Sequence, residues 1–223
     1  MNLKAILMVA SATVIASCSS KEVPQTPAEA LIDRLESLVD QGSIMFGHQD
    51  TYLYGHSWKI ASDAQTYDRT DIKDVAGAYP AFSGMDLGGI ELDSPVNIDN
   101  NDFNHMRASA VAHHLRGGVV SFSWHLRNPL TGGDTWDTSS TEVVASILPG
   151  GQKHEMFMGW LSKAADYLES IRTPEGELVP VIFRPWHEHT RNFFWWGLDL
   201  CTKEQYVALW RMTYDYMTVE RGL

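Results

Sequence analysis

The chain of 223 residues has few cysteines and an excess of negative charge. One of its two cysteines, Cys18, lies close to the N-terminus, so Cys201 is left alone in the folded part and no internal disulfide is expected there. We expect Cys201 to be a small, partly buried residue. Lysine and arginine total 17 against 28 aspartates and glutamates, a net charge of −11. This balance argues against a nucleic-acid partner, which would require a basic surface, and against a polybasic membrane-binding face.

The apolar run Ala5–Ala16 is shorter than the roughly 20 residues that a membrane-spanning helix needs. Lys4 precedes it and small residues follow it, which is the pattern of a signal peptide. The sequence Ile-Ala-Ser-Cys at 15–18 resembles a bacterial lipobox. This resemblance implies cleavage before Cys18, lipidation of Cys18, and a lipid-anchored place in the bacterial cell envelope, at the outer membrane or cell surface. The alternative is an ordinary secreted protein with a chance cysteine.

The chain therefore divides into a lipoprotein signal peptide over 1–17, a lipidated tether over 18–27, and one folded domain over 28–223. Apolar spacing within that domain predicts helices that alternate with short apolar strands. We expect helices over 28–39, 68–76, 101–115, 155–171 and 204–217, and strands over 43–47, 80–83, 119–123 and 179–183.

Strands that alternate with helices pair in parallel through helical crossovers, and strands buried on both faces are almost wholly apolar. The polar and aromatic residues of this chain follow the strands, as they do at the active face of a (β/α)8 barrel. The sequence therefore predicts an α/β fold of the TIM-barrel type, with about four βα units present. A doubly wound open sheet is the alternative, but no glycine-rich phosphate fingerprint follows the first strand.

The segment 183–197 is the richest in candidate catalytic side chains: it contains an arginine, two histidines and Glu188, followed by a cluster of aromatic residues. A carboxyl group beside apolar rings is desolvated, which raises its pKa and allows it to donate a proton to a glycosidic oxygen. The rings can stack on sugar faces. The eight tryptophans of the chain suit either such a cleft or a packed aromatic core. Together these features favour glycoside hydrolysis.

The sequence Arg-Pro-Trp-His-Glu at 184–188, with Phe-Trp-Trp-Gly at 194–197, resembles glycoside hydrolase family 26, the β-mannanase family. Segments 46–56, 84–86 and 123–129 agree with the same family in order and spacing. The resemblance implies a (β/α)8 barrel, β-mannan or a related plant polysaccharide as substrate, and endo-hydrolysis of β-1,4-mannosidic bonds with retention of configuration. It implies no cofactor.

The resemblance also assigns roles to residues of this chain. Glu188 is expected to be the general acid/base, and His125 and His187 to hold the sugar in the cleaved subsite. Three aromatic residues are expected to shape or line the cleft: Trp186, Phe193 and Trp196. Phe193 stands where some relatives have a tryptophan platform, so stacking at this position is expected to be weaker.

Other interpretations of these residues stay open. His187 and His189, with His125 or His48, could bind a metal, although strand alternation would then turn Glu188 away from it. Arg184 could be structural and pair with Asp86 beneath the site. His48 and His56 are expected to make hydrogen bonds at the top of the barrel. No glycines typical of a nucleophile elbow flank Ser83 or Ser123, so serine chemistry is unsupported.

A retaining glycosidase needs a second carboxylate about 5 Å from the first. The family has this nucleophile near the end of strand seven, and no remaining acidic residue here matches it; Glu204 and Glu220 fall on the last predicted helix. We therefore expect a truncated barrel with unpaired strand edges, which favour aggregation. Three hypotheses follow: an endo-β-1,4-mannanase, a non-catalytic glycan-binding lipoprotein or inactive remnant, and a β-glucanase of the same family.

Overall fold

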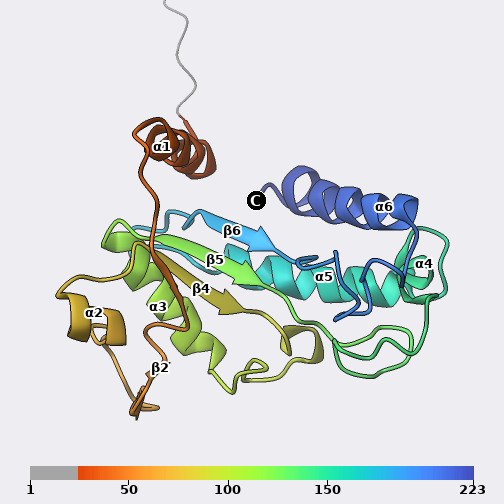
Figure 1. The fold of residues 1–223 in the computed structure, drawn as a ribbon, viewed down its shortest axis with the longest axis horizontal. Helices are drawn as coiled ribbons and strands as arrows, with labels where there is room; N and C mark the ends of the chain where they lie inside the picture. Colours follow the sequence, from red (N-terminus) through yellow and green to blue (C-terminus); the bar gives the residue numbers. More distant parts are fainter. Residues whose placement is uncertain (1–24) are drawn as a thin grey trace, which may run out of the picture.

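The computed structural model describes residues 25–223, so the predicted signal peptide and the lipidation site at Cys18 lie outside the described residues. Four parallel strands form one sheet in the order β1-β4-β5-β6 (Figure 1). Their bounds are Gly47–Gln49 for β1, Phe82–Asp86 for β4, Val119–Ser123 for β5 and Val181–Arg184 for β6. Strands β2 (Tyr54–Gly55) and β3 (Trp58–Lys59) form a small antiparallel hairpin after β1.

Helices join the strands, and α3 and α5 lie against one face of the sheet (Figure 1). The helices are α1 (Pro27–Asp40), α2 (Asp71–Ala76), α3 (Phe103–Leu115), α4 (Val143–Ile147), α5 (His154–Glu169) and α6 (Lys203–Tyr214). A 3-10 turn, η1 (Ile90–Leu92), follows β4, and a π-helical turn, η2 (Asp215–Glu220), extends α6. Alternation of strand and helix in parallel order confirms the predicted α/β architecture.

Strand register brings the carboxyl ends of the strands level with one another. Asp86 at the end of β4 pairs with Ser123 at the end of β5, and Ser123 pairs with Arg184 at the end of β6. Side chains at and just beyond these three positions therefore meet at one edge of the sheet. This is the edge at which parallel α/β folds carry their active sites.

An aromatic core fixes the sheet to its helices. Phe122 on β5 packs edge-on against Tyr167 of α5, which in turn meets Phe103 of α3. Farther along the sheet the indoles of Trp124 and Trp186 lie 6.3 Å apart by ring centroid and are fully buried. The core is therefore most aromatic directly beneath the carboxyl ends of the strands.

Local sequence explains where the helices begin. Helix α1 starts with a capping box in which Thr26 and Glu29 satisfy each other's backbone N–H groups. Thr202 and Gln205 do the same for α6. Among residues 25–223 no helix combines the length and apolar character needed to cross a membrane.

Most predicted elements are confirmed, and β5 spans the predicted residues. The first strand differs from the prediction over 43–47: it begins at Gly47, and the apolar residues Ile44 and Phe46 before it are 95% and 61% exposed. Helix α4, the β2–β3 hairpin and η1 were not predicted, since each is too short to show a periodic apolar pattern. The last predicted helix changes to π-helical geometry after Tyr214.

Candidate active site

A buried carboxylate forms the floor of the site. Asp86 is 1% exposed and accepts hydrogen bonds from Ser123 Oγ at 2.6 Å, from His125 Nδ1 at 2.7 Å and from the backbone N–H of Gly88 at 2.7 Å. Burial acts to raise the pKa of Asp86, but the hydrogen bond and charge of His125 together with the hydrogen bonds from Ser123 and Gly88 outweigh burial, so the pKa is lowered. Asp86 is therefore an anion that anchors the end of β4 to the end of β5.

The two histidines predicted to hold the sugar do meet. His125 Nε2 lies 3.1 Å from His187 Nε2, and His187 Nδ1 donates to the carbonyl oxygen of Arg184 at 3.2 Å. Burial lowers the pKa of His187, and the neighbouring His125 lowers it further. Trp136 stacks on His125 with ring centroids 5.8 Å apart, and Phe194 meets the same imidazole edge-on at 5.0 Å.

Glu188 follows β6 in a left-handed backbone conformation with φ 57°. Trp196 Nε1 donates to the preceding carbonyl, that of His187, at 2.8 Å, which fixes the turn. The carboxylate is about half exposed (53%) and its Oε1 is 4.0 Å from the Arg184 guanidinium. The sequence predicted a desolvated carboxyl among rings; the structure instead places it on the solvent side, where a polymer could reach it.

The aromatic residues divide into buried and exposed groups. Trp186 and Trp196 are 1% and 0% exposed, so neither indole offers a face to a sugar in this structure. Trp186 Nε1 donates to Thr213 Oγ1 at 3.0 Å, which ties the site to α6. Phe193 is 54% exposed and is free to contact a ligand. The two tryptophans therefore shape the site from beneath instead of lining it.

Arg184 does not pair with Asp86, so that structural interpretation of Arg184 is wrong. The carboxylate of Asp86 accepts its hydrogen bonds from Ser123 and His125, and the Arg184 guanidinium lies near Glu188 instead. His189 turns away from the two paired histidines and stacks on Tyr206 at 4.2 Å. Within residues 25–223 no three His, Cys, Asp or Glu side chains gather as metal ligands would. His48 Nδ1 is buried without a hydrogen-bond partner, contrary to the hydrogen bonding predicted for it.

Two residues of the site were missed by sequence reasoning. Trp136, 53% exposed, covers His125 from the loop after β5; an isolated tryptophan in a loop rich in glycine and aspartate was the available signal. Asp50 directly follows β1 with φ 50°, is 1% exposed, and has an Oδ1 without a partner. Burial, with the charges of Asp99 and Asp86 nearby, raises the pKa of Asp50 to about 7. Its place directly after a strand was the signal.

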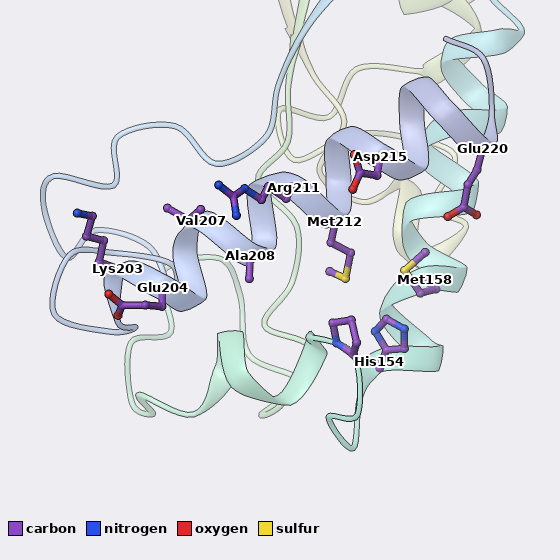
Figure 2. Close-up of a pocket in the computed structure, with 11 residues that line it drawn as sticks. His154, Met158, Lys203, Glu204, Val207, Ala208, Arg211, Met212, Asp215 and Glu220 are labelled. Carbon is purple, nitrogen blue, oxygen red and sulfur yellow. The ribbon is translucent and has the colours of Figure 1, made fainter.

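A cleft of about 240 Å³ opens beside His125, between the loops that follow β4 and β5. Trp136, Arg127, Asp134 and Ile98 are among its lining residues. A larger hollow of about 810 Å³ lies between α5 and α6, with Met158, Met212 and Arg211 in its wall (Figure 2). None of the site residues described above lines that larger hollow, whereas His125 and Trp136 line the smaller cleft.

A carboxylate, paired histidines and aromatic rings at the carboxyl ends of parallel strands are the arrangement of a (β/α)-barrel enzyme. The family model described as glycosyl hydrolase family 26 matches residues 21–223. The chain belongs to glycosyl hydrolase family 26, as the resemblance at 184–188 implied.

Solved structures agree with this assignment. A GH26 β-mannanase from Bacteroides ovatus is 46% identical, with a TM-score of 0.82, over 88% of this chain and 56% of that chain. The catalytic domain of an endo-β-1,4-mannanase from a Bacillus species is 34% identical, with a TM-score of 0.78, over 89% of this chain and 51% of that one. The fold is that of the TIM-barrel enzymes of this family, and the chain spans about half of their length.

Among curated proteins, a mannan endo-1,4-β-mannosidase from Bifidobacterium adolescentis is 32% identical over 84% of this chain and 18% of its own length. The enzyme of the same name from Bacillus subtilis is 30% identical over 68% of this chain and 43% of its own length. The chain thus spans less than half of the curated relatives it matches.

Proposed function

We propose that the chain takes part in the endo-hydrolysis of β-1,4-mannosidic bonds in mannan or galactomannan, with Glu188 as the general acid/base. The observation that carries this proposal is the position of Glu188 in the turn that follows β6, where it is half exposed and held by the hydrogen bond from Trp196. The names of the relatives, mannan endo-1,4-β-mannosidases, support the substrate class.

In this proposal Glu188 gives its proton to the glycosidic oxygen as the bond to the leaving sugar breaks and the anomeric carbon bonds to a second carboxylate, which none of the acidic residues of this chain matches. Glu188 later takes a proton from the water that displaces that carboxylate. The guanidinium of Arg184, 4.0 Å away, orients the carboxylate. The exposed rings of Trp136 and Phe193 offer apolar faces to the sugars. Trp186 and Trp196 hold this layer in place from the core.

Replacing Glu188 tests the assignment. We expect Glu188→Gln to lower mannan hydrolysis by about 100-fold to 10,000-fold, because the leaving sugar then departs without a proton. An aryl mannoside with a dinitrophenolate leaving group needs no proton, so where the wild-type chain releases this phenolate the same variant should release it as well. Reducing-sugar release from mannan and phenolate release from the aryl mannoside measure the two reactions, and β-glucan assayed beside mannan separates the two specificities.

Glu204→Gln is the matched control, since Glu204 is exposed on α6 and should leave both rates unchanged. Loss of both reactions in Glu188→Gln to the same degree would argue against an acid/base role. A wild-type chain that is retarded by mannan in a gel yet releases no sugar would point to a glycan-binding protein instead.

We also propose that the chain is exported and anchored to the bacterial cell envelope by lipid on Cys18. The support is the sequence alone: Lys4, the apolar run Ala5–Ala16, and Cys18 after small residues. We expect the wild type to incorporate labelled palmitate and to enter the detergent-rich phase, and Cys18→Ala to do neither. Cys201→Ala is the control. Palmitate incorporation that survives in Cys18→Ala would refute the anchor.

A further inference from the structure

Four ring nitrogens of His125 and His187 are accounted for by contacts within the protein. His125 Nδ1 faces Asp86 Oδ2 at 2.7 Å, and His187 Nδ1 faces the carbonyl oxygen of Arg184 at 3.2 Å. A carboxylate and a carbonyl oxygen only accept hydrogen bonds, so both Nδ1 atoms must carry a proton. The remaining two nitrogens, both Nε2, face each other at 3.1 Å.

Two neutral imidazoles in this arrangement would each present a bare Nε2 to the other. Two lone pairs at 3.1 Å repel, so the contact is a hydrogen bond only if one of the nitrogens is protonated. The ring that carries this additional proton has both nitrogens protonated and is therefore a cation. The geometry requires one proton more than two neutral histidines hold.

The surroundings decide which ring is charged. His125 touches the buried carboxylate of Asp86, whereas the Nδ1 partner of His187 is a neutral carbonyl. Trp136 stacks on His125 at 5.8 Å, within the range at which an aromatic face stabilises a cation. Burial lowers the pKa of His187, which agrees with a neutral ring there.

We propose that Asp86, His125 and His187 form a row that holds one additional proton, carried by His125, and that Asp86 is the positioning residue that keeps it there. His125 donates to Asp86 at one end and to His187 at the other. The row is neutral as a whole, yet it fixes both imidazoles and places a cation at the base of the cleft. This deepens the proposed function, on which its relevance to mannan binding rests.

Other charged groups face this row from the neighbouring elements. Asp99, from the loop after η1, interacts with both Asp86 and the His125 charge. Arg184 and Glu188, from the end of β6, act on His187 with opposite signs. Because these two lie at the His187 end, the carboxylates of Asp86 and Asp99 dominate at the His125 end and favour the cation on that ring.

Replacing Asp86 by Asn separates this proposal from a merely structural role. The amide keeps the size of the side chain and can still accept from the N–H of Gly88, while its NH₂ group faces His125. His125 Nδ1 must then accept instead of donate, so it loses its proton and keeps only the one on Nε2. The bond to His187 survives, but the additional proton is gone.

Long-range ¹H–¹⁵N spectra of the ¹⁵N-labelled chain count these protons. We expect three protonated nitrogens and one bare nitrogen in the two rings of the wild type, and two of each in Asp86→Asn. Ser123→Ala, which removes a hydrogen bond to Asp86 but leaves its charge, should keep three.

His187→Gln offers a second route if Asp86→Asn does not fold, because the Gln carbonyl can still accept from His125 Nε2. We expect His125 to stay doubly protonated in this variant. Two bare nitrogens in the wild type, or three protonated nitrogens in Asp86→Asn, would overturn the proposal. The spectra need no hydrolysis, so a failure of this inference is distinguishable from a failure of the proposed function.

Discussion

Asp50→Asn should stabilise the chain at about pH 8 by about 2 to 4 kcal/mol while changing its stability little near pH 4. The carboxyl of Asp50 is 1% exposed and its Oδ1 has no partner, so ionisation is opposed by lost hydration. Its pKa is raised from 3.8 to about 7. Each pKa unit corresponds to about 1.4 kcal/mol, which sets the upper end of the expected range.

The direction follows from proton linkage. The folded state binds the Asp50 proton more tightly than the unfolded state, so the wild type loses stability as pH rises from about 4 to about 7. Asn cannot ionise, and it tolerates the left-handed backbone at φ 50° as readily as Asp does. Urea unfolding at both pH values measures the difference.

The control for this prediction is Asp63→Asn, since Asp63 is exposed and its charge should matter little at either pH. An equal gain in both variants would indicate a general effect of net charge instead of local desolvation. If Asp50→Asn gains nothing at pH 8, the buried carboxylate has a partner, such as water, that offsets its burial.

Trp186→Ala should lower the free energy of unfolding by about 3 to 5 kcal/mol, the usual effect of removing a large buried ring. Trp186 packs against Trp124 and Trp196 with centroids 6.3 and 5.5 Å away, and its Nε1 donates to Thr213. The substitution removes both the packing and the hydrogen bond. Denaturant unfolding followed by circular dichroism measures this loss.

Trp136→Ala is the matched comparison, because Trp136 is 53% exposed and should contribute little to stability. We expect this variant to unfold like the wild type and to bind mannan less well in affinity electrophoresis. The opposite outcome, in which Trp186→Ala folds normally and loses only binding, would indicate that Trp186 lines the cleft instead of shaping it from the core.

The contrast between these tryptophans shows how far sequence reasoning reaches. Apolar periodicity located the strands and long helices, and the motif at 184–188 led to Glu188, because both signals are local. Whether an aromatic ring faces the core or the cleft depends on packing between distant segments. Trp186 and Trp196, expected at the cleft, are therefore buried, while Trp136, which drew no notice, is exposed.

The contacts of the charged residues likewise depend on packing between segments that are distant in sequence. Register brings Asp86 beside Ser123, and the two histidines meet from loops that are 62 residues apart in sequence. No local pattern predicts such contacts, so Arg184 was matched with the wrong carboxylate. The π-helical turn after α6 and the left-handed conformation of Asp50 just after β1 were also not predictable from local sequence, since both depend on tertiary contacts.

The left-handed backbone conformation at Glu188 also predicts which amino acids this position would accept during evolution. A residue with a Cβ atom loses about 1 to 2 kcal/mol in that conformation, and glycine does not. Selection for a stable fold alone would therefore replace Glu188 with glycine or asparagine. Under the proposed acid/base role, glutamate should persist at position 188 only in lineages that use its carboxylate, and a lineage without that activity should lose the glutamate early.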